Sequence, residues 1–193
     1  MIKVAVTGGI GSGKSYICAM LEKRGIHIYS CDDAAKRLMA TSDKIKSGLI
    51  SLVGGNAYVN GVLNKSALTS FLLKNSENTK KINSIVHPAV AEDFLGSDYT
   101  WMECAILFTS GFDKLVDKIV CVTAPLEVRI RRVMERDNIT RQRACEWINH
   151  QMSQEEMAEL SDYVIVNDGV RDIDRQINEV LRSLDKLDRK STR

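Results

Sequence analysis

One segment near the start of the chain limits the possible folds more than any other. It reads Gly8-Gly9-Ile10-Gly11-Ser12-Gly13-Lys14-Ser15 and matches the pattern G-x-x-x-x-G-K-[ST] at every fixed position. A β-branched apolar run, 2–7, precedes it, and a segment with helical spacing follows. In a strand–loop–helix of this kind the glycines let the main chain wrap tightly, so that backbone N–H groups and the helix N-terminus face phosphate oxygens. The segment therefore predicts a nucleoside triphosphate site and not an ordinary glycine-rich turn.

Two side chains of this segment have direct roles in the predicted site. Lys14 is placed to reach the β- and γ-phosphates, and the Ser15 hydroxyl is placed to ligate Mg²⁺. The nucleotide-binding residues expected here are Gly9, Ile10, Gly11, Ser12, Gly13, Lys14, Ser15 and Tyr16.

The rest of the chain alternates between strand-like and helix-like segments. After the first strand, the strand candidates are 26–29, 101–107, 118–123 and 163–166. The helix candidates between and after them include 15–24, 34–40, 126–136, 141–151, 154–159 and 173–187. Strands that alternate with helices form parallel, doubly wound sheets. We therefore expect an α/β fold, in which the phosphate loop sits on a doubly wound five-stranded parallel sheet, within a single domain that spans 1–193.

Two segments interrupt this alternation. From Ser42 to about Leu95 the spacing is helical, apart from a turn-rich connector at 56–63, which predicts a helical lobe inserted between strands. Within this lobe the expected helix caps are Asn64 or Ser66 and then Ser76, and Pro88 should end or kink the last helix near His87. The second segment, approximately 126–160, is helix-like and rich in arginine, and we expect it to form a lid.

Composition excludes several classes of protein. The 193 residues are 44% hydrophobic, and the formal net charge of +2 gives no reason to expect nucleic acid as a partner. The sequence has no uncharged run of about 18 apolar residues that would span a bilayer, and a strand begins almost at once, which fits no signal peptide. Five dispersed cysteines indicate reduced thiols. We expect a cytoplasmic protein without a membrane partner, and its oligomeric state stays open.

Further features separate the classes of P-loop protein. The N-K-x-D element typical of GTPases is absent, and a Walker-B strand is hard to place, because Glu103 lies inside the run 101–107. A kinase that acts on a small metabolite needs an acid at the acceptor site, a substrate lobe and a lid that brings arginines to the phosphates. The chain has a candidate for each of these three parts.

Asp32 is the candidate acid, with Asp33 as its rival. Both follow the second predicted strand, at the edge where ligands of parallel sheets collect, and a carboxylate there would accept the proton of an attacking hydroxyl. The alternative role for either aspartate is a helix N-cap. Lys36 and Arg37, one turn later, either hold phosphates of the acceptor or lie on a polar helix face.

Arginines are concentrated in the predicted lid. A lid with such side chains would neutralise charge on the transferring phosphoryl group and exclude water, although a solvated helix face explains most of the arginines individually. We favour Arg136 for the catalytic role. The full set is Arg129, Arg131, Arg132, Arg136, Arg141 and Arg143.

Two other polar positions are candidates. His87 lies next to Pro88 among apolar residues, and is either a hydrogen-bonded structural histidine or a substrate contact. Asn167-Asp168-Gly169 follows the last predicted strand, where Asn167 and Gly169 would recognise adenine or else form a simple turn.

Taken together, these motifs resemble those of the dephospho-CoA kinase family along nearly the whole chain. The segment 6–15 is similar to the family's opening T-G-G-I-G-S-G-K-S, and 30–36 resembles its D-A-D-x-I-A-R element, with Asp32 on the second aspartate. His87-Pro88 matches the family's H-P. The later matches are Ala105-Ile106-Leu107-Phe108, which stands where P-L-L-F is usual, Gln151, and Asn167-Asp168-Gly169 for N-x-G.

Five positions differ from the family pattern. Ser30 stands for the first aspartate of D-A-D, Lys36 for the arginine, Ala105 for the proline, Thr109 for the glutamate and Tyr16 for the common threonine. These differences leave the phosphate loop, Asp32 and the lid arginines in place.

The resemblance implies that ATP, with Mg²⁺, phosphorylates the ribose 3′-hydroxyl of dephospho-CoA to give CoA and ADP, the last step of coenzyme A biosynthesis. It implies an acceptor-binding lobe at approximately 32–95. The implied catalytic residues are Asp32, Lys14 and Arg136, and the implied acceptor contacts are Asp32, Lys36, His87 and Phe108. The alternatives are another P-loop metabolite kinase, of the nucleoside monophosphate or shikimate type, and a non-catalytic ATP-binding switch protein.

Overall fold

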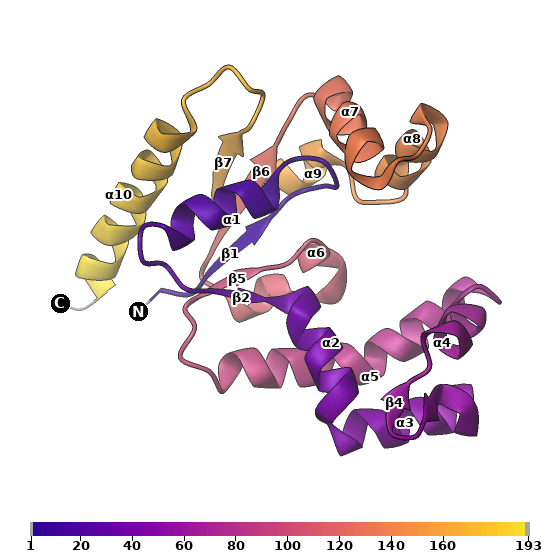
Figure 1. The fold of residues 1–193 in the computed structure, drawn as a ribbon. Helices are drawn as coiled ribbons and strands as arrows, with labels where there is room; N and C mark the ends of the chain where they lie inside the picture. Colours follow the sequence, from indigo (N-terminus) through magenta and orange to yellow (C-terminus); the bar gives the residue numbers. More distant parts are fainter. Residues whose placement is uncertain (1, 192–193) are drawn as a thin grey trace. The chain divides into compact units, whose positions relative to one another are not determined.

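The computed structural model describes residues 2–191, and the chain forms two compact units. The first unit comprises Met1–Tyr29 and Tyr99–Arg193 and contains the main sheet. The second unit, Ser30–Asp98, is mostly helical. Figure 1 traces both units along the chain. Within residues 2–191, no helix combines the length and the apolar character needed to cross a membrane.

The first unit is built on a five-stranded sheet with the strand order β2-β5-β1-β6-β7. Its strands are β1 (Val4–Thr7), β2 (Ile28–Ser30), β5 (Trp101–Glu103), β6 (Lys118–Thr123) and β7 (Tyr163–Val166). β1 pairs in parallel with both β5 and β6, and β6 pairs in parallel with β7. The predicted five-stranded parallel sheet is confirmed. The loops that follow these strands therefore lie at one edge of the sheet, where ligands of such folds bind.

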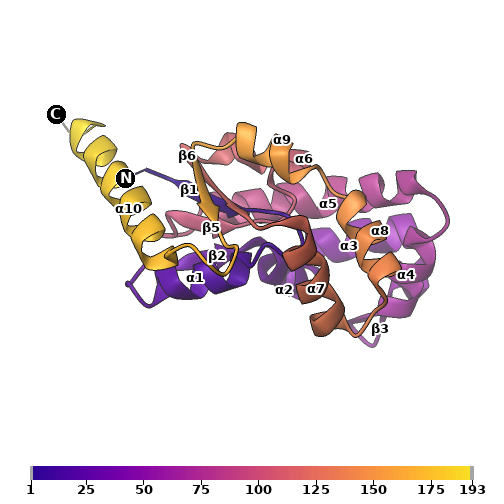
Figure 2. The same cartoon turned by 90° about the horizontal axis from the view of Figure 1, so that it is seen from above.

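Helices cover both faces of this sheet. α1 (Lys14–Glu22) and α10 (Ile173–Ser191) bury Ile17 and Ile177 completely against alternate strand residues such as Val4 and Val120. Figure 2 shows α1 and α10 on one side of the sheet and the short helices α6 (Leu107–Ser110) and α9 (Gln154–Glu159) on the other. The strands are nearly continuous apolar runs because both faces are covered. The doubly wound arrangement agrees with the prediction.

The segment predicted as a lid contains α7 (Leu126–Asp137), α8 (Arg141–Asn149) and α9. α7 and α8 pack through a small core of their own, made by Ile130, Val133, Ala144 and Ile148. Thr140 caps α8, and Ser153 and Glu156 form a reciprocal capping box at the start of α9. The three predicted helices are confirmed with their ends shifted by no more than two residues.

The second unit packs three helices against a long one. α5 (Ser76–Leu95) contacts α2 (Cys31–Thr41), α3 (Asp43–Val53) and α4 (Lys65–Leu72). Each helix begins after a polar residue whose side chain accepts a backbone N–H: Ser30, Ser42, Asn64 and Asn75. Asn64 is the predicted cap, whereas the cap of α5 is Asn75, one residue before the predicted Ser76.

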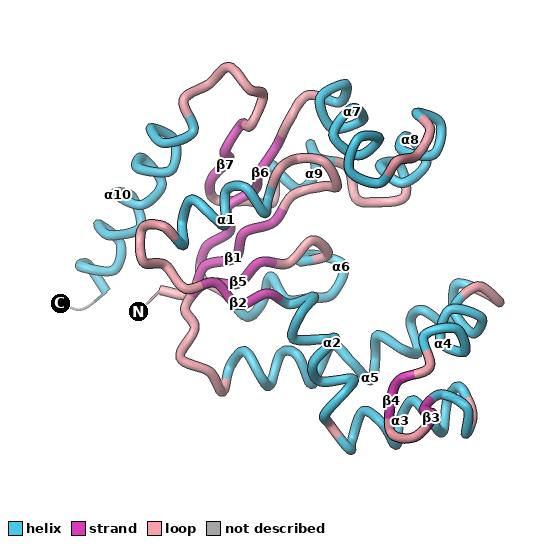
Figure 3. The backbone as a smooth tube through the Cα atoms, in the orientation of Figure 1, coloured by secondary structure: helices cyan, strands magenta, loops and turns pink. Residues whose placement is uncertain are grey.

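The connector at 56–63 contains strands that the sequence prediction missed. After the 3₁₀ turn η1 (Gly55–Ala57), β3 (Tyr58–Val59) and β4 (Val62–Leu63) form a two-stranded antiparallel hairpin, drawn in magenta in Figure 3. Its two-residue turn is Asn60-Gly61, and both residues have positive φ, 50° and 79°. Asn-Gly is the preferred sequence for such a turn, so the sequence contains a hairpin signal that the prediction of a turn-rich connector does not use.

Of the two alternatives predicted for Pro88, that it ends or kinks its helix, the first is wrong. α5 continues through Pro88 to Leu95. Its buried positions Ile82, Val86, Val90 and Phe94 recur every four residues on both sides of the proline. Packing of this continuous apolar face outweighs the local cost of a helical proline, which is about 3 kcal/mol.

The strand predicted at 101–107 is also shorter than expected. β5 ends at Glu103, although the Cys104 N–H still donates to the Val6 carbonyl. The chain then turns into α6 and the 3₁₀ turn η2 (Phe112–Leu115). The apolar run misled the prediction because Leu107 is buried from a helix and not from a strand, and a short apolar run does not distinguish the two.

Candidate functional site

The phosphate loop, residues 8–13, connects β1 to α1 at the edge of the sheet where the parallel strands end (Figure 3). Gly13 has a φ of +93°, and a Cβ on it would lie 2.1 Å from Nδ2 of Asn167. A Cβ on Gly9 would lie 2.5 Å from a terminal nitrogen of Arg129. The loop thus needs glycine at these positions because neighbouring side chains press directly on its main chain.

Lys14 lies in the first turn of α1 and forms an ion pair with Glu103, the last residue of β5. The distance from Lys14 Nζ to Glu103 Oε1 is 3.2 Å, and the two side chains are only 12% and 18% exposed. β1 lies beside β5 in the sheet, so the last residue of β5 comes next to the loop that follows β1. This pair holds the ammonium group of Lys14 at the loop.

Two side chains brace the outer side of the loop. Asn167 donates from Nδ2 to the Ser12 carbonyl at 3.0 Å. Arg132 donates to the carbonyls of Gly11 and Ser12 at 3.3 and 3.2 Å, and to Oδ1 of Asn167 at 3.3 Å. These bonds occupy carbonyl oxygens, which would repel phosphate, and so fix the direction in which the loop's peptide groups point.

Ile10 is held from both sides. Its N–H donates to Oε1 of Gln151 at 2.7 Å, and its carbonyl accepts from Nε of Arg129 at 2.9 Å. Arg129 is only 5% exposed, and burial lowers the pKa of its guanidinium, which still leaves it charged near neutral pH. The segment 126–160 therefore contributes three of the side chains that shape the phosphate loop.

Three other arginines of that segment form ion pairs at the surface, and Arg131 is exposed. Arg141 bonds Glu127 at 2.6 Å, and Arg143 bonds Glu146 at 3.0 Å. Arg136, favoured for catalysis, pairs with Asp137 at 2.7 Å and its side chain is 60% exposed. For Arg141 and Arg143 the solvated helix face is the better interpretation, whereas the catalytic role of Arg136 stays a prediction.

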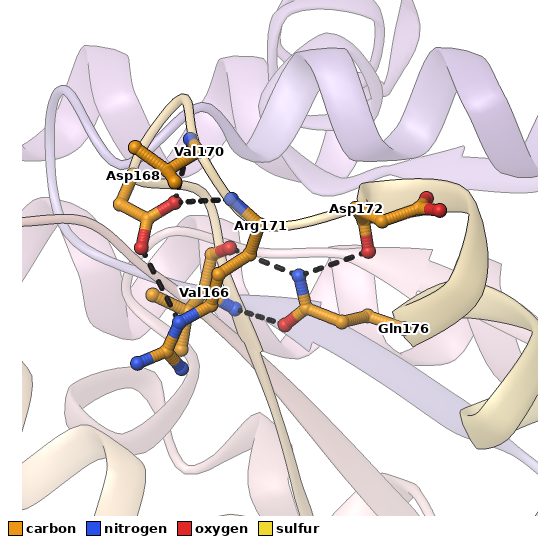
Figure 4. A network of polar contacts seen from close by, with 6 residues as sticks. All are labelled: Val166, Asp168, Val170, Arg171, Asp172 and Gln176. Carbon is orange, nitrogen blue, oxygen red and sulfur yellow. Dashed lines mark hydrogen bonds and ion pairs between the residues drawn. The ribbon is translucent and has the colours of Figure 1, made fainter.

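A network of polar contacts links the residues of the loop after β7 and the start of α10 (Figure 4). Oδ1 of Asp168 accepts from the N–H groups of Val170 and Arg171, both at 2.9 Å, and Oδ2 lies 3.3 Å from Nε of Arg171. The two backbone hydrogen bonds lower the pKa of the Asp168 carboxyl. Gln176 bonds both the N–H and the carbonyl of Val166. The chain bends at Asp168 and Gly169, held by side chains that the sequence prediction did not consider, and recognition of adenine by Asn167 and Gly169 stays a prediction.

A pocket of about 600 Å³ lies between the phosphate loop and the loop after β7. All of its walls belong to the first unit. Its lining includes the predicted nucleotide residues Gly13, Tyr16, Asn167 and Gly169. It also includes Met20, Arg132, Arg171, Ile173 and Asp174.

Asp32 and Asp33 lie in the first turn of α2, in the second unit, and both are exposed. Neither is the helix cap, because the hydroxyl of Ser30 accepts the N–H of Asp33. The cap alternative for the two aspartates is therefore wrong. Asp33 pairs with Lys36 at 2.9 Å, and this contact lowers the pKa of Asp33 and raises that of Lys36. Arg37 pairs with Asp93 at 2.5 Å.

His87 and Phe108, the other predicted acceptor contacts, occupy different units. His87 is half-buried in α5, and burial lowers its pKa. Phe108 lies on α6 and lines a small pocket of about 120 Å³. Other residues of that pocket are Ala105, Thr109, His150, Gln151 and Met157.

The residues around the phosphate loop fit a nucleotide with a hard cation. The hydroxyl of Ser12 is fully buried and has no hydrogen-bond partner within residues 2–191. Oxygen groups of the kind that Mg²⁺ prefers as ligands lie at the loop, among them the Ser15 hydroxyl and the Glu103 carboxylate. No group of three or more His, Cys, Asp or Glu residues in the described chain would hold a metal by itself. Such a site suits Mg²⁺ held mainly by substrate phosphates and water.

Sequence reasoning missed three contributors to this site. The sequence analysis gives Glu103 no role. The pairing of β5 with β1, which brings Glu103 next to Lys14, follows only from the sheet order. Arg129 and Arg132 were treated as lid arginines, whereas they bond the main chain of the phosphate loop. Their spacing of three residues on an amphipathic helix is the signal that both face one side.

Known proteins of one enzyme family are similar to this chain along most of its length. A model of the Dephospho-CoA kinase family matches residues 2–172. A dephospho-CoA kinase of Bacteroides fragilis is 40% identical over 190 residues, which cover 95% of this chain and 93% of that protein. A protein of known crystal structure from Thermus thermophilus is 30% identical, with a TM-score of 0.79 and coverage of 95% and 97%. A dephospho-CoA kinase from Campylobacter jejuni, 19% identical, shares the fold with a TM-score of 0.66 over 98% of each chain.

Proposed function

The chain belongs to the dephospho-CoA kinase family and is an ATP-dependent kinase of dephospho-CoA, and from that premise we propose how its residues perform the transfer. The reaction moves the γ-phosphoryl group of ATP to the 3′-hydroxyl of the dephospho-CoA ribose. The proposal treats 1–193 as one kinase domain, with an acceptor-binding lobe at approximately 32–95 and a lid at approximately 126–160.

The phosphate loop binds the triphosphate. The N–H groups of Ile10 and Ser12 donate within the protein, and the other backbone N–H groups of the loop, with the N-terminus of α1, surround the β- and γ-phosphates. Lys14 exchanges its contact with Glu103 for the phosphate oxygens, which carry more charge than one carboxylate. When bound, Mg²⁺ supplies charge neutralisation at the β- and γ-phosphates, and the Ser15 hydroxyl would hold it.

Asp32 accepts the proton of the attacking hydroxyl. Its carboxylate is exposed at the start of α2 and has no ion-pair partner among the described residues, whereas Asp33 is engaged by Lys36. A carboxylate that is not already paired is the better proton acceptor, which favours Asp32 over Asp33. Lys36, His87 and Phe108 are the proposed further contacts of the acceptor.

Arg136 stabilises the transferring phosphoryl group. Its guanidinium is at the exposed end of α7 and, within residues 2–191, bonds only its neighbour Asp137. It makes none of the main-chain contacts that occupy Arg129 and Arg132. Closing the segment 126–160 over the nucleotide would exclude water, so that the ribose hydroxyl is the acceptor.

The observation that carries the proposal is the phosphate loop itself, whose carbonyls are occupied by Arg132 and Asn167 while Lys14 is held at its end. The test is release of ADP from Mg-ATP by the purified protein, with dephospho-CoA, with a nucleoside monophosphate and with shikimate. Stimulation by dephospho-CoA alone is the expected result. Stimulation by another acceptor would overturn the substrate, and tight ATP binding without any transfer would favour a switch protein.

A further inference from the structure

The pocket of about 600 Å³ has two flat side chains on its walls, from different elements. Tyr16 comes from the first turn of α1 and is 57% exposed. Arg171 comes from the loop after β7, and its side chain is 61% exposed. Both planar groups therefore have accessible faces. An aromatic ring and a guanidinium that border one pocket are suited to a flat, electron-rich ligand.

Arg171 is held in place at one end only. Oδ2 of Asp168 lies 3.3 Å from its Nε, and Oδ1 of the same carboxylate accepts the Arg171 backbone N–H (Figure 4). Asp168 is itself well sheltered, with a side chain 19% exposed. The structure gives no other ion pair or hydrogen bond of the Arg171 guanidinium within residues 2–191. Its plane is thus oriented while its outer nitrogens and its faces remain available.

Most hydrogen-bond donors of the loop that carries Arg171 already bond within the protein, so few can bond the edge of a base. The Asn167 N–H donates to the Thr123 carbonyl at 2.7 Å, and the Asn167 side chain is shared between Ser12 and Arg132. The other backbone N–H groups already donated within the protein are those of Val166, Val170 and Arg171. Discrimination between adenine and guanine depends on the pattern of donors and acceptors at the base edge.

We propose that Arg171 is a specificity-determining residue of the nucleotide site, where its guanidinium stacks on one face of a purine whose other face lies against Tyr16. This inference rests on the proposed function, which brings a nucleoside triphosphate to the neighbouring phosphate loop. Stacking selects flat rings by area and is indifferent to the edge pattern, since every base has a π-face. The site accordingly accepts ATP and GTP within about tenfold of each other and binds pyrimidine nucleotides more weakly.

The test compares nucleotides with a ligand that has no base. Calorimetric titration in the presence of Mg²⁺ gives the Kd of ATP, GTP and inorganic tripolyphosphate for the wild type and for Arg171→Ala and Arg171→Lys. Loss of one stacking partner should raise the Kd of ATP and of GTP about 5- to 100-fold. Tripolyphosphate should bind as in the wild type. Arg171→Lys should resemble Arg171→Ala, because it keeps the charge and loses the plane.

Two further variants separate stacking from other causes. Arg175→Ala removes a comparable arginine on α10 that pairs with Glu179, and it should leave every Kd unchanged. Asp168→Asn keeps an oxygen for the two backbone N–H groups but removes the charge that orients Arg171, and it should weaken ATP less than Arg171→Ala does.

Three results would overturn the proposal. They are an unchanged Kd of ATP in Arg171→Ala, an equal loss for ATP and tripolyphosphate, which would indicate a charge contact alone, and a wild type that prefers ATP to GTP by more than about 100-fold. Failure of the proposed function is a separate result, because it would be absence of phosphate transfer to dephospho-CoA by the wild type with any nucleotide.

Discussion

The residues expected to bind the nucleotide and those expected to bind the acceptor are built differently. Around the phosphate loop, Lys14, Arg132 and Asn167 are buried or half-buried and bond either the loop's own peptide groups or a sheltered carboxylate. In the helical unit, Asp32 and Lys36 are exposed on the first turns of α2, and within residues 2–191 the ion pair of Lys36 is with Asp33, three residues earlier.

This difference indicates two ways of preparing a site. The nucleotide residues are oriented before the ligand arrives, which reduces the ordering cost of binding. On the proposed assignments, Asp32 and Lys36 would gain their orientation from the acceptor when it binds. Substitutions in the first group should therefore alter nucleotide affinity, and substitutions in the second should alter turnover with little effect on nucleotide affinity.

The largest effect is expected for Lys14→Met, which removes the charge nearest the transferring group. We expect kcat to fall about 10³-fold, because a preorganised donor at the developing charge is lost. The variant also leaves the Glu103 carboxylate, 18% exposed, without its partner, so the melting temperature should fall. Lys23→Met, at the exposed end of α1, is the matched control and should behave as the wild type in an ADP-release assay. Normal turnover in Lys14→Met would contradict a role of Lys14, and of the phosphate loop, in the reaction.

Asp32→Asn should distinguish the acceptor residues from the nucleotide residues most clearly. Removal of the proton acceptor should lower kcat about 100-fold, while the Kd of ATP stays the same. Asp33→Asn is the control, since its carboxylate is engaged by Lys36, and it should retain most of the turnover. The reverse outcome, with turnover lost in Asp33→Asn and kept in Asp32→Asn, would shift the assignment by one residue.

Arg132→Ala tests whether bracing of the phosphate loop controls affinity. Its guanidinium donates to two loop carbonyls and to Asn167, so its loss should raise the Kd of ATP about tenfold, the equivalent of one to two net hydrogen bonds. Arg131→Ala, on the exposed side of the same helix, should leave the Kd unchanged in the same titration. Equal Kd values for both variants would mean that the loop keeps its shape without the brace.

The smallest effect concerns pH and the helical unit. Burial lowers the pKa of His87, so the unfolded chain binds this proton more readily than the folded one. The stability contributed by neutral His87 is complete above about pH 6.5 and is lost as the pH falls through its lower folded value. Between pH 7.5 and 5, His87→Gln should lose roughly 1–3 °C less in melting temperature than the wild type. The exposed His27→Gln is the control, and identical losses in both variants would contradict the assignment.

The predictability of each part follows from how local its signal is. The segment 8–15 and its flanking strand and helix were readable because loop conformation, phosphate binding and glycine spacing lie within eight consecutive residues. The strands β6 and β7 were found at their observed ends, since a fully buried strand is a plain apolar run. The helix end expected as one alternative at Pro88 does not occur, because packing of Val86 and Val90 on a shared face, a property of the tertiary fold, overrides the local rule.

The bracing of the phosphate loop was not readable in this way. Arg132 and Ser12 are 120 residues apart, and Lys14 meets Glu103 only because β1 and β5 are neighbours in the sheet. Composition distinguished an arginine-rich segment but not which of its arginines would turn inward. A sheet order was needed before these residues could be assigned to the loop.

The most direct test of the account is the amount of CoA formed for each ADP released. The purified protein is given Mg-ATP and dephospho-CoA, ADP is quantified by a coupled assay, and the CoA product is quantified by chromatography with mass detection. The account predicts one CoA for each ADP, with little ADP released when dephospho-CoA is left out. ADP that accumulates without CoA, or at a rate that dephospho-CoA does not change, would contradict it.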